Sequence, residues 1–450
     1  MRAIHTRKAA LEILVRSETR GAFSSELLAR AARSKAIHLP LLQRLVKGTI
    51  EWRGRIDDEL AARIPRPLSQ YSPTARNILR LAAYQLLFLE RVPYERVVTE
   101  SAALLSTEKV SIREEVRGVI EGLRNKSPAA KPPRTPETAA EIARYYSHPE
   151  WLIERWIATL GVAETRRLCG ANNRAWPVSI RANTLRISPH QLAKTLAREG
   201  VTTAPSRYVP ECLVIKSLPR GIRLDQLEGF QRGMFQVQDE SAALVGHLMS
   251  PRANDFVIDL CAAPGGKATH LATLMRNRGE VLALDLNATR LRSITQNSRR
   301  LGLSIVKTRA GDAAKLRSKH LADRVLLDAP CSGFGVLGRK TDIRWAKTPA
   351  TIKELVVLQT KLIDHAATLV RPGGVLVYST CTVEREENEG IIEAFLDRHP
   401  DFQLLPPPAE LPKSLFHGNY LRTWPHRHGI GGAFAAALAR VTPPQRGNAG

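Results

Sequence analysis

From about residue 230 onward, short apolar segments alternate with longer helical segments, and this alternation limits the possible folds more than any other feature of the chain. The apolar segments are rich in Val, Ile and Leu, which is typical of strands buried on both faces. Strands that alternate with helices form parallel sheets. We therefore predict an α/β doubly wound, Rossmann-like domain over residues 229–442, with strands in DFVIDL (255–260), EVLALDL (280–286), SIVKTRAGD (304–312), RVLLDAP (324–330) and GVLVYST (374–380).

Each predicted strand ends on a carboxylate or a thiol: Cys261, Asp285, Asp312, Asp328 and Cys381. A sixth such residue, Cys331, follows Asp328 within the segment DAPCS. Ligands of doubly wound sheets bind outside the carboxyl ends of the strands. We therefore expect these side chains to converge on one crevice.

The loop after the first strand, CAAPGGKATHLATLM, has the character of a cofactor loop. Gly265 and Gly266 permit a close approach of the backbone, and the helix that follows offers free amide groups. Asp285 lies 20 residues after Gly265, the separation expected for an acid that binds ribose hydroxyls. The pattern is neither GxGxxG nor a P-loop, because Cys261 and Ala268 stand where those motifs need other residues. A nucleoside cofactor without a pyrophosphate, such as S-adenosylmethionine, suits this loop.

Two thiols beside a nucleoside cofactor indicate nucleophilic chemistry. We expect Cys381 to lie at the start of the helix EREENEGIIEAFLDRH, where the helix dipole lowers the pKa of a thiol, although Glu384, Glu386 and Glu387 oppose this effect. Cys331 would reach the same position from the neighbouring strand. The residues alone leave both thiols as candidate nucleophiles.

Residues 1–126 show helical patterns only. The clearest pattern is SPTARNILRLAAYQLLFLE, in which Ser72 is a suitable cap, Pro73 suits the first turn, and one apolar face is expected to be buried. The Pro-rich segment 127–141 is predicted to be a linker. Residues 142–228, with the strand-like PVSIRANT (177–184), are predicted to form a small α/β lobe, and residues 443–450 a tail.

The composition of the chain indicates a polyanionic partner. The chain has 450 residues, more than the ~100 to 200 of a typical domain, and a formal net charge of +24. Residues 1–126 have 23 basic and 14 acidic residues, which gives +9 of the total +24. The charge is therefore spread over both parts of the chain, and it favours nucleic acid binding. Five cysteines without a CxxC pair indicate reduced thiols, and Cys169 and Cys212 are expected in the core.

Targeting and metal signals are weak. No apolar run approaches the ~18 residues of a membrane span. The basic N-terminus is interrupted by Glu12 and lacks a cleavage site, so we expect a cytosolic protein, without a membrane partner. His270 is the one histidine that could join the cysteines around zinc, but the spacing matches no finger or ribbon, so we expect no metal. We also expect a monomer.

Three motifs, DLCAAPGGK, DAPCSGFGV and YSTCTVEREENE, together resemble the RNA 5-methylcytosine methyltransferases of the Nol1/Nop2/Sun type over nearly the whole chain. The segment RNILRLAAYQLLFLERVPYERVVTESAALL (76–105) resembles the antitermination factor NusB, which implies an all-helical RNA-binding domain. Together these resemblances imply S-adenosylmethionine-dependent methylation of cytosine C5 in RNA, with 16S ribosomal RNA as the expected partner.

The resemblance also assigns roles to residues. It implies that Cys381 is the nucleophile that adds to cytosine C6, and that Cys331 helps to release the product. Lys267 and Asp328 are expected to face the target base as well as the cofactor. The expected cofactor-binding residues are Cys261, Ala262, Ala263, Pro264, Gly265, Gly266, Lys267, Asp285, Asp312 and Asp328.

Two departures from the family pattern stand out: Thr341 replaces a usual proline, and Gly431–Ala433 lie in IGGAFAAAL where the family has Asp-Gly-Phe-Phe. We expect neither to touch the thiols or the cofactor loop. Near Thr341, the charged and aromatic residues suit either an RNA contact or a solvated loop; they are Arg339, Lys340, Arg344 and Trp345.

Alternative functions are the same chemistry on transfer RNA or 23S ribosomal RNA, a catalytically idle RNA-binding or antitermination factor, and a DNA cytosine methyltransferase with Cys331 as nucleophile.

Overall fold

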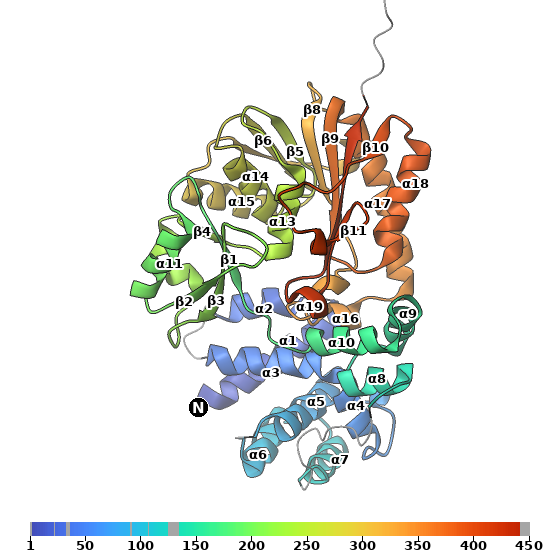
Figure 1. Ribbon diagram of the computed structural model, residues 1–450. Helices are drawn as coiled ribbons and strands as arrows, with labels where there is room; N and C mark the ends of the chain where they lie inside the picture. Colours follow the sequence, from blue (N-terminus) through green and yellow to red (C-terminus); the bar gives the residue numbers. More distant parts are fainter. Residues whose placement is uncertain are drawn as a thin grey trace, which may run out of the picture. The chain divides into compact units, whose positions relative to one another are not determined.

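The chain forms two compact units. The computed structural model describes residues 2–21, 23–32, 37–90, 92–106, 108–124 and 135–441 (Figure 1). The first unit holds the residues up to Arg174 together with Leu337–Ala346, and the second holds Ala175–Val336 and the residues from Lys347 onward. Most of the predicted linker and all of the predicted tail lie outside the described residues. No helix in the described ranges has both the length and the apolar character needed to cross a membrane.

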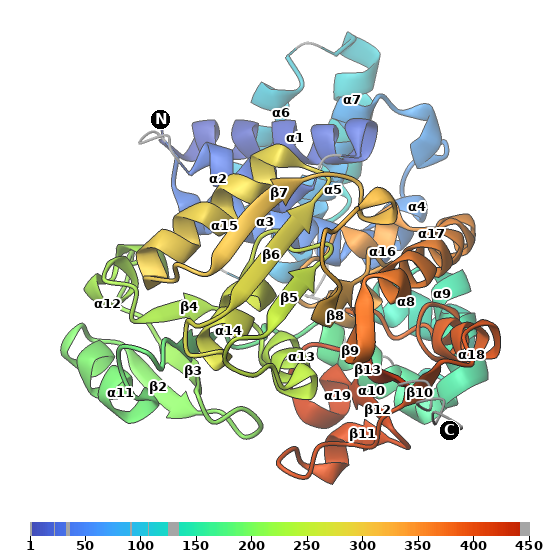
Figure 2. The same cartoon turned by 90° about the horizontal axis from the view of Figure 1, so that it is seen from above.

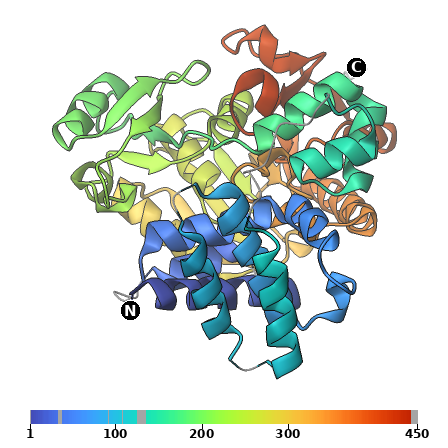
Figure 3. The ribbon, with the colours of Figure 1, turned by 90° about the horizontal axis from the view of Figure 1, so that it is seen from below.

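The first unit is helical, as predicted, and appears in blue to teal in Figure 3. Its helices are α1 (Arg2–Arg20), α2 (Ser24–Ala31), α3 (Leu39–Glu51), α4 (Arg53–Ala61), α5 (Pro73–Phe88), α6 (Tyr94–Leu104), α7 (Val110–Glu121), α8 (Ala139–Tyr146), α9 (Glu150–Leu160) and α10 (Val162–Asn172), with the short helix α16 (Ile343–Ala346) from the later part of the chain.

Helix α5 is the central helix of this unit. Ser72 caps it by accepting a hydrogen bond from the backbone N–H of Ala75 at 3.0 Å, as the sequence predicts. The prediction that only one face is buried is wrong, because nearly every side chain from Asn77 to Leu87 is buried. Burial on all sides includes Arg80, whose guanidinium is neutralised by Asp57 and Glu18 at 2.6 and 3.0 Å.

The first part of the predicted small lobe is helical. Helices α8 to α10, which we placed in the lobe, cluster with the first unit, where α8 packs against α4 and α9. Their apolar faces bury Ile142, Leu152, Trp156 and Leu168.

Segment 337–346 also belongs to the first unit, and the expected role as an RNA contact or a solvated loop is wrong for two of its four candidate residues. Arg344 is fully buried and donates hydrogen bonds to the carbonyl oxygens of Glu51 and Ser147 at 3.1 and 2.9 Å. The indole N–H of Trp345 donates to the Ile50 carbonyl oxygen at 2.7 Å. Two of the side chains that suggested RNA binding therefore stabilise the helical unit instead.

The small lobe of the second unit is a four-stranded antiparallel sheet of order β2-β3-β1-β4. Its strands are β1 (Ser179–Ala182), β2 (Thr202–Pro205), β3 (Cys212–Ser217) and β4 (Phe235–Val237), and its helices are α11 (Pro189–Arg198) and α12 (Glu228–Gln231). Strand β1 lies within the predicted segment 177–184. A core that includes Ile180, Leu192 and Phe235 joins sheet and helices.

The large sheet of the second unit has the order β11-β12-β13-β9-β8-β5-β6-β7, and β10 pairs with β13 (Figure 2). The strands β5 (Phe256–Asp259), β6 (Glu280–Asp285), β7 (Val306–Ala310), β8 (Ala322–Asp328) and β9 (Val370–Thr380) are parallel and match the five predicted segments. The remaining strands are β10 (Phe402–Leu404), β11 (Phe416–His417), β12 (Tyr420–Thr423) and β13 (Ala433–Arg440).

The sheet is mixed, because β13 pairs antiparallel with β9 and brings β10 to β12 with it. Our prediction of a parallel sheet is correct for β5 to β9 and omitted this antiparallel extension. The run AFAAALAR is small and apolar on both faces, so it satisfies a buried strand of either direction, and direction depends on the connection.

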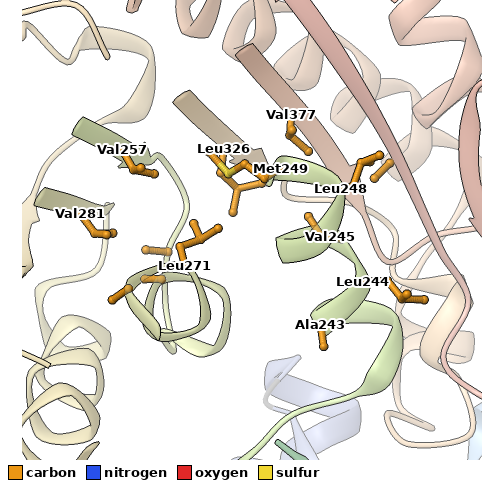
Figure 4. Packing of buried hydrophobic residues seen from close by; sticks show 14 of the residues in the cluster. Ala243, Leu244, Val245, Leu248, Met249, Val257, Leu271, Val281, Leu326 and Val377 are labelled. Carbon is orange, nitrogen blue, oxygen red and sulfur yellow. The ribbon is translucent and has the colours of Figure 1, made fainter. Parts of the chain in front are cut away.

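Helices cover both faces of the sheet. On one face lie α13 (Glu240–Met249), α14 (Gly266–Leu274) and α15 (Ala288–Leu301), and Figure 4 shows Val257, Val281, Leu326 and Val377 packed with α13 and Leu271. On the other face lie α17 (Pro349–Thr368) and α18 (Glu389–Arg398). The short helix α19 (Pro425–His428) follows β12. Burial of both faces leaves the carboxyl edge of the parallel strands as the place for a site.

Candidate active site

The two thiols that end β8 and β9 lie in contact. Sγ of Cys331 is 3.4 Å from Sγ of Cys381, and the backbone N–H of Cys381 donates to Cys331 Sγ at 3.4 Å. The parallel register of β8 and β9, which pairs Asp328 with Ser379, puts both cysteines just beyond the same edge of the sheet. The structure thus brings together two residues that are 50 positions apart in the chain.

The two thiols differ in how firmly each holds its proton. The hydrogen bond with Cys381, reinforced by burial, raises the pKa of Cys331 well above its usual range. Cys331 therefore keeps its proton at neutral pH and presents an S–H group to the Cys381 sulfur. This arrangement favours the thiolate at Cys381.

The expected helix dipole does not act on Cys381. Helix α18 begins at Glu389, and a short 3-10 turn (Arg385–Glu387) precedes it, so Cys381 lies well before the helix. The prediction of a helix N-terminus at this thiol is therefore wrong. The acidic and polar run after Cys381 instead folds into a turn, because residues such as Asn388 compete for backbone hydrogen bonds and delay the helix.

A lysine supplies the positive charge instead. Nζ of Lys267 lies 2.7 Å from Oδ2 of Asp328, and the Ser379 hydroxyl donates to Asp328 Oδ1 at 2.8 Å. Burial acts to lower the pKa of Lys267, but the charges of Asp328 and Cys381 outweigh it and the pKa is raised. By the same interaction, the ammonium group stabilises a thiolate at Cys381.

The predicted cofactor loop forms a tight turn ahead of α14. Gly265 has φ +99°, and a Cβ there would lie 2.9 Å from the Ile294 side chain, so this position requires glycine. Asp285 accepts hydrogen bonds from the backbone N–H groups of Ala263 at 3.1 Å and Asn287 at 2.9 Å. The carboxylate at the end of β6 therefore fixes the loop that follows β5.

The other predicted cofactor residues lie at the same sheet edge with different surroundings. Burial raises the pKa of Cys261, so that thiol stays protonated. Asp312 follows β7, is half-exposed, and accepts a hydrogen bond from the backbone N–H of Ala314 at 2.9 Å. Leu286, directly after Asp285, has 79% of its side chain exposed, which is unusual for a large apolar residue at the edge of a site.

Two residues near the site were missed by the sequence analysis. Asp259 is fully buried, and burial together with the charge of Asp328 raises its pKa to about 8. Arg181 on β1 is buried and donates to the Gly266 carbonyl oxygen at 3.0 Å, which holds the first turn of α14. A charged residue inside the apolar segments FVID and SIRA was the available signal, because buried charges need a partner or a shifted pKa.

His270 lies against a carboxylate and a second histidine. Its Nε2 is 2.8 Å from Glu211 Oε1, and His247 Nε2 lies 2.7 Å from the same oxygen. These three side chains are the right types for a metal. However, the other ring nitrogen of His270 is buried without a hydrogen-bond partner, whereas a metal-bound imidazole needs an acceptor there. Burial lowers the pKa of His270 to about 3, so a neutral His270 that donates its Nε2–H to Glu211 accounts for its contact.

The glycines that depart from the family pattern lie closer to the thiols than we expected. The backbone N–H of Gly432 donates to the Gly335 carbonyl oxygen at 2.8 Å, and the N–H of Gly335 donates to the Cys381 carbonyl oxygen at 2.9 Å. The departure reaches the backbone carbonyl of Cys381 through Gly335, because β13 pairs with β9 and returns to its end. Thr341, by contrast, lies in the helical unit.

Comparison with known proteins identifies three domains. The profile of the 16S rRNA methyltransferase RsmB/F family matches residues 246–439. The NusB family profile matches residues 4–114, and the ferredoxin-like domain of RsmF/B-like methyltransferases matches residues 148–220. These matches agree with a helical front part, a small lobe and a methyltransferase domain.

Among solved structures, the crystal structure of PH0851 matches with a TM-score of 0.81 at 30% identity, covering 96% of this chain and 98% of that chain. NSun6 from Pyrococcus horikoshii, crystallised with SFG, matches with a TM-score of 0.58 at 27% identity, covering 66% and 99%.

Full-length relatives agree. The probable ribosomal RNA small subunit methyltransferase B of Synechocystis sp. is 34% identical, covering 97% of this chain and 100% of that protein. The protein of the same name from Bacillus subtilis is 32% identical, covering 98% and 100%. The chain therefore belongs to the ribosomal RNA small subunit methyltransferase B family, with a NusB domain ahead of its methyltransferase domain.

Proposed function

We propose that this protein methylates C5 of a cytosine in 16S ribosomal RNA, with S-adenosylmethionine as methyl donor and Cys381 as nucleophile. The single observation that carries the proposal is the contact of Cys331 and Cys381, 3.4 Å apart. The adjacent Lys267–Asp328 pair adds a buried charge to the same place. Methylation of a weakly nucleophilic ring carbon needs a thiolate that first adds to the neighbouring carbon.

The residues at the sheet edge fit S-adenosylmethionine, which supplies a methyl group on a positively charged sulfur. In this proposal the carboxylate of Asp285 accepts the ribose hydroxyls, and the exposed Leu286 packs against the adenine ring. The loop 261–266, with Asp312 and Asp328, would surround the remainder. The family membership and the SFG-bound structure of NSun6 support this assignment.

The thiol pair can carry both halves of the reaction. Cys381 Sγ bonds to C6, which moves electron density to C5, the atom that receives the methyl group. Once bonded to carbon, Cys381 no longer supplies the hydrogen bond and the charge that raise the pKa of Cys331, so the pKa of Cys331 falls and its proton passes to water more easily. The Cys331 thiolate then accepts the C5 proton while the C6–S bond breaks and its electron pair returns to Cys381. The net products are methylated RNA, S-adenosylhomocysteine and one proton, and the original thiol pair is restored.

The ribosomal RNA assignment rests on the family and on charge. The relatives are named for the small ribosomal subunit, and a net charge of +24 suits a phosphate backbone. Bisulfite sequencing of total RNA from a deletion strain should show one cytosine of 16S RNA that loses its modification and regains it on complementation. Loss at a cytosine in transfer RNA or 23S RNA would redirect the substrate, and loss nowhere would favour the idle RNA-binding factor.

A covalent trap tests the chemistry. With 5-fluorocytosine RNA and S-adenosylmethionine, the wild-type protein should form a stable protein–RNA adduct that peptide mass spectrometry places on Cys381. Cys381→Ala should form none, Cys331→Ala should accumulate adduct on ordinary RNA, and Cys169→Ala, a buried thiol of the first unit, should behave as wild type. An adduct on Cys331 or DNA methylation in place of RNA methylation would overturn the proposal.

A further inference from the structure

The backbone on both sides of Cys331 is held by one buried carboxylate and one amide. Glu387 accepts hydrogen bonds from the backbone N–H of Ser332 at 2.8 Å and from its hydroxyl. Gln359 donates from one nitrogen to the Pro330 carbonyl oxygen at 2.8 Å and to Glu387 at 2.9 Å. The residues before and after Cys331 are therefore both fixed through the Glu387 carboxylate.

The next residue in the chain holds Cys381 in the same manner. The Thr380 hydroxyl donates to Asn388 Oδ1 at 2.6 Å, and Asn388 Nδ2 donates to the Thr382 carbonyl oxygen at 3.1 Å. The side chain of Asn388 thus spans the residues before and after Cys381. Both its oxygen and its nitrogen are used, which fixes the orientation of the amide.

The two cysteine loops are also joined directly. The hydroxyls of Ser332 and Thr382, one residue after each cysteine, lie 2.7 Å apart. The side chains that make the contacts of the two loops are at most 2% exposed: Ser332, Gln359, Thr380, Thr382, Glu387 and Asn388. The Tyr378 hydroxyl donates to the Glu387 carbonyl oxygen at 2.7 Å, so the 3-10 turn itself is tied to β9. A fully buried polar network of this kind holds one geometry, because each broken bond would leave an unpaired group.

We propose that Glu387 and Asn388 are positioning residues that set the distance between the two thiols, Glu387 by holding Cys331 and Asn388 by holding Cys381. This inference rests on the proposed function only for its catalytic consequence. Since the two residues are consecutive, the spacing of the thiols is fixed by one short stretch of backbone. The residues further divide the task, so that loss of Glu387 moves Cys331 while loss of Asn388 moves Cys381.

A distance measurement tests the placement without any substrate. Diamide takes two electrons and two protons from a pair of thiols, becoming a hydrazine while the thiols form a disulfide. Wild-type protein should form a Cys331–Cys381 disulfide readily, because the sulfurs are in contact. Glu387→Ala and Asn388→Ala should each slow this reaction by about 10-fold or more. Glu393→Ala, an exposed glutamate on α18, should leave the rate unchanged.

Separate rates of adduct formation and adduct release test the division of roles between Glu387 and Asn388. Glu387→Ala should still form the Cys381 adduct but release it about 10- to 100-fold more slowly, as Cys331→Ala does. Asn388→Ala should instead lose adduct formation. Glu387→Gln keeps a carbonyl oxygen for Ser332 N–H and Gln359, and it places an amide N–H against the Ser332 hydroxyl. Its rates should therefore be close to those of the wild type. This variant is the control for a general folding defect in Glu387→Ala.

The outcomes separate the two proposals. If wild type forms no Cys381 adduct but the alanine variants slow disulfide formation, the positioning holds and the proposed function fails. If the wild-type adduct forms and folded Glu387→Ala and Asn388→Ala variants keep wild-type disulfide and adduct kinetics, the positioning proposal is overturned. Equal loss of adduct formation in both variants would overturn the division of roles.

Discussion

Lys267 and Asp328 form an ion pair, with Nζ and Oδ2 2.7 Å apart, beside the Cys381 sulfur whose charge contributes to the raised pKa of the lysine. Lys267 arrives from the first turn of α14 and Asp328 from the end of β8. The pair therefore links the cofactor loop to the thiols, and it provides the positive charge that a helix N-terminus was expected to provide.

Lys267→Met should lower the rate of Cys381 adduct formation by about 100-fold, because the thiolate loses its neighbouring cation. The residual rate should rise with pH as more thiolate forms. Single-turnover trapping on RNA between pH 6 and 9 measures both effects. Lys315→Met, an exposed lysine 3.9 Å from Asp312, is the matched control and should react as wild type. A pH-independent loss would show that Lys267 acts only in binding.

Asp259→Asn should stabilise the second unit increasingly as pH rises. The pKa of Asp259 is about 8 in the folded protein and about 3.8 when exposed, so the folded state keeps a proton that the unfolded state releases between these values. Wild-type stability from this group is therefore present below pH 4 and lost as pH rises toward 8, by roughly 1.4 kcal/mol per pH unit. The asparagine does not titrate and escapes this loss.

Denaturant titrations at pH 5, 6 and 7 measure this difference in the free energy of unfolding. Asp397→Asn, an exposed carboxylate on α18, is the control and should change the pH dependence little. Parallel pH profiles for Asp259→Asn and wild type would mean that Asp259 is ionised in the fold.

Arg344→Met should destabilise the first unit by about 2–4 kcal/mol, because it leaves the carbonyl oxygens of Glu51 and Ser147 and the Asn173 side chain without a buried donor. Burial already raises the pKa of Glu51 to about 7 against the opposing charge of Arg344, so the variant should raise it further. The denaturation midpoint of the helical unit measures the loss. Lys340→Met, exposed in the same segment, should leave the midpoint unchanged, and a neutral Arg344→Met would contradict the packing.

Gly335→Ala should reduce methylation by about 10-fold or more, because the new Cβ would overlap the Gly432 carbonyl oxygen and lie 2.7 Å from the Cys381 carbonyl oxygen. Backbone on both sides must shift, and Cys381 shifts with it. Methyl transfer and thermal unfolding should be measured together. Gly118→Ala, in α7 with open space around it, is the control and should be neutral or slightly stabilising. Wild-type activity in Gly335→Ala would mean that the Cys381 loop tolerates displacement.

Much of the site could be predicted because its signals are local in sequence. Four of the five parallel strands are apolar runs and β7 is an exposed edge strand, but each is followed by a carboxylate or a thiol, and a parallel sheet gathers those ends at one edge. Gly265 was recognisable because a tight turn after a strand needs a residue that tolerates positive φ.

Residues whose roles depend on distant partners escaped prediction or were misjudged. Arg344 and Trp345 look like RNA contacts in sequence, yet their partners Ser147 and Ile50 lie 197 and 295 positions away. Glu387 and Asn388 looked like charged or polar residues of a helix start, and only the fold buries them against Ser332, Thr380 and Thr382.

The sequence by itself thus determined the helical front part, the five parallel strands and the two candidate thiols, since periodicity and strand-end chemistry are properties of short segments. Tertiary structure alone decided the 3.4 Å contact between the sulfurs, the direction of β13 and the cation beside Cys381. The physical reason is that a hydrogen bond or an ion pair between two distant segments forms only where the folded backbone brings them together. Residue types in a short segment do not specify that meeting point.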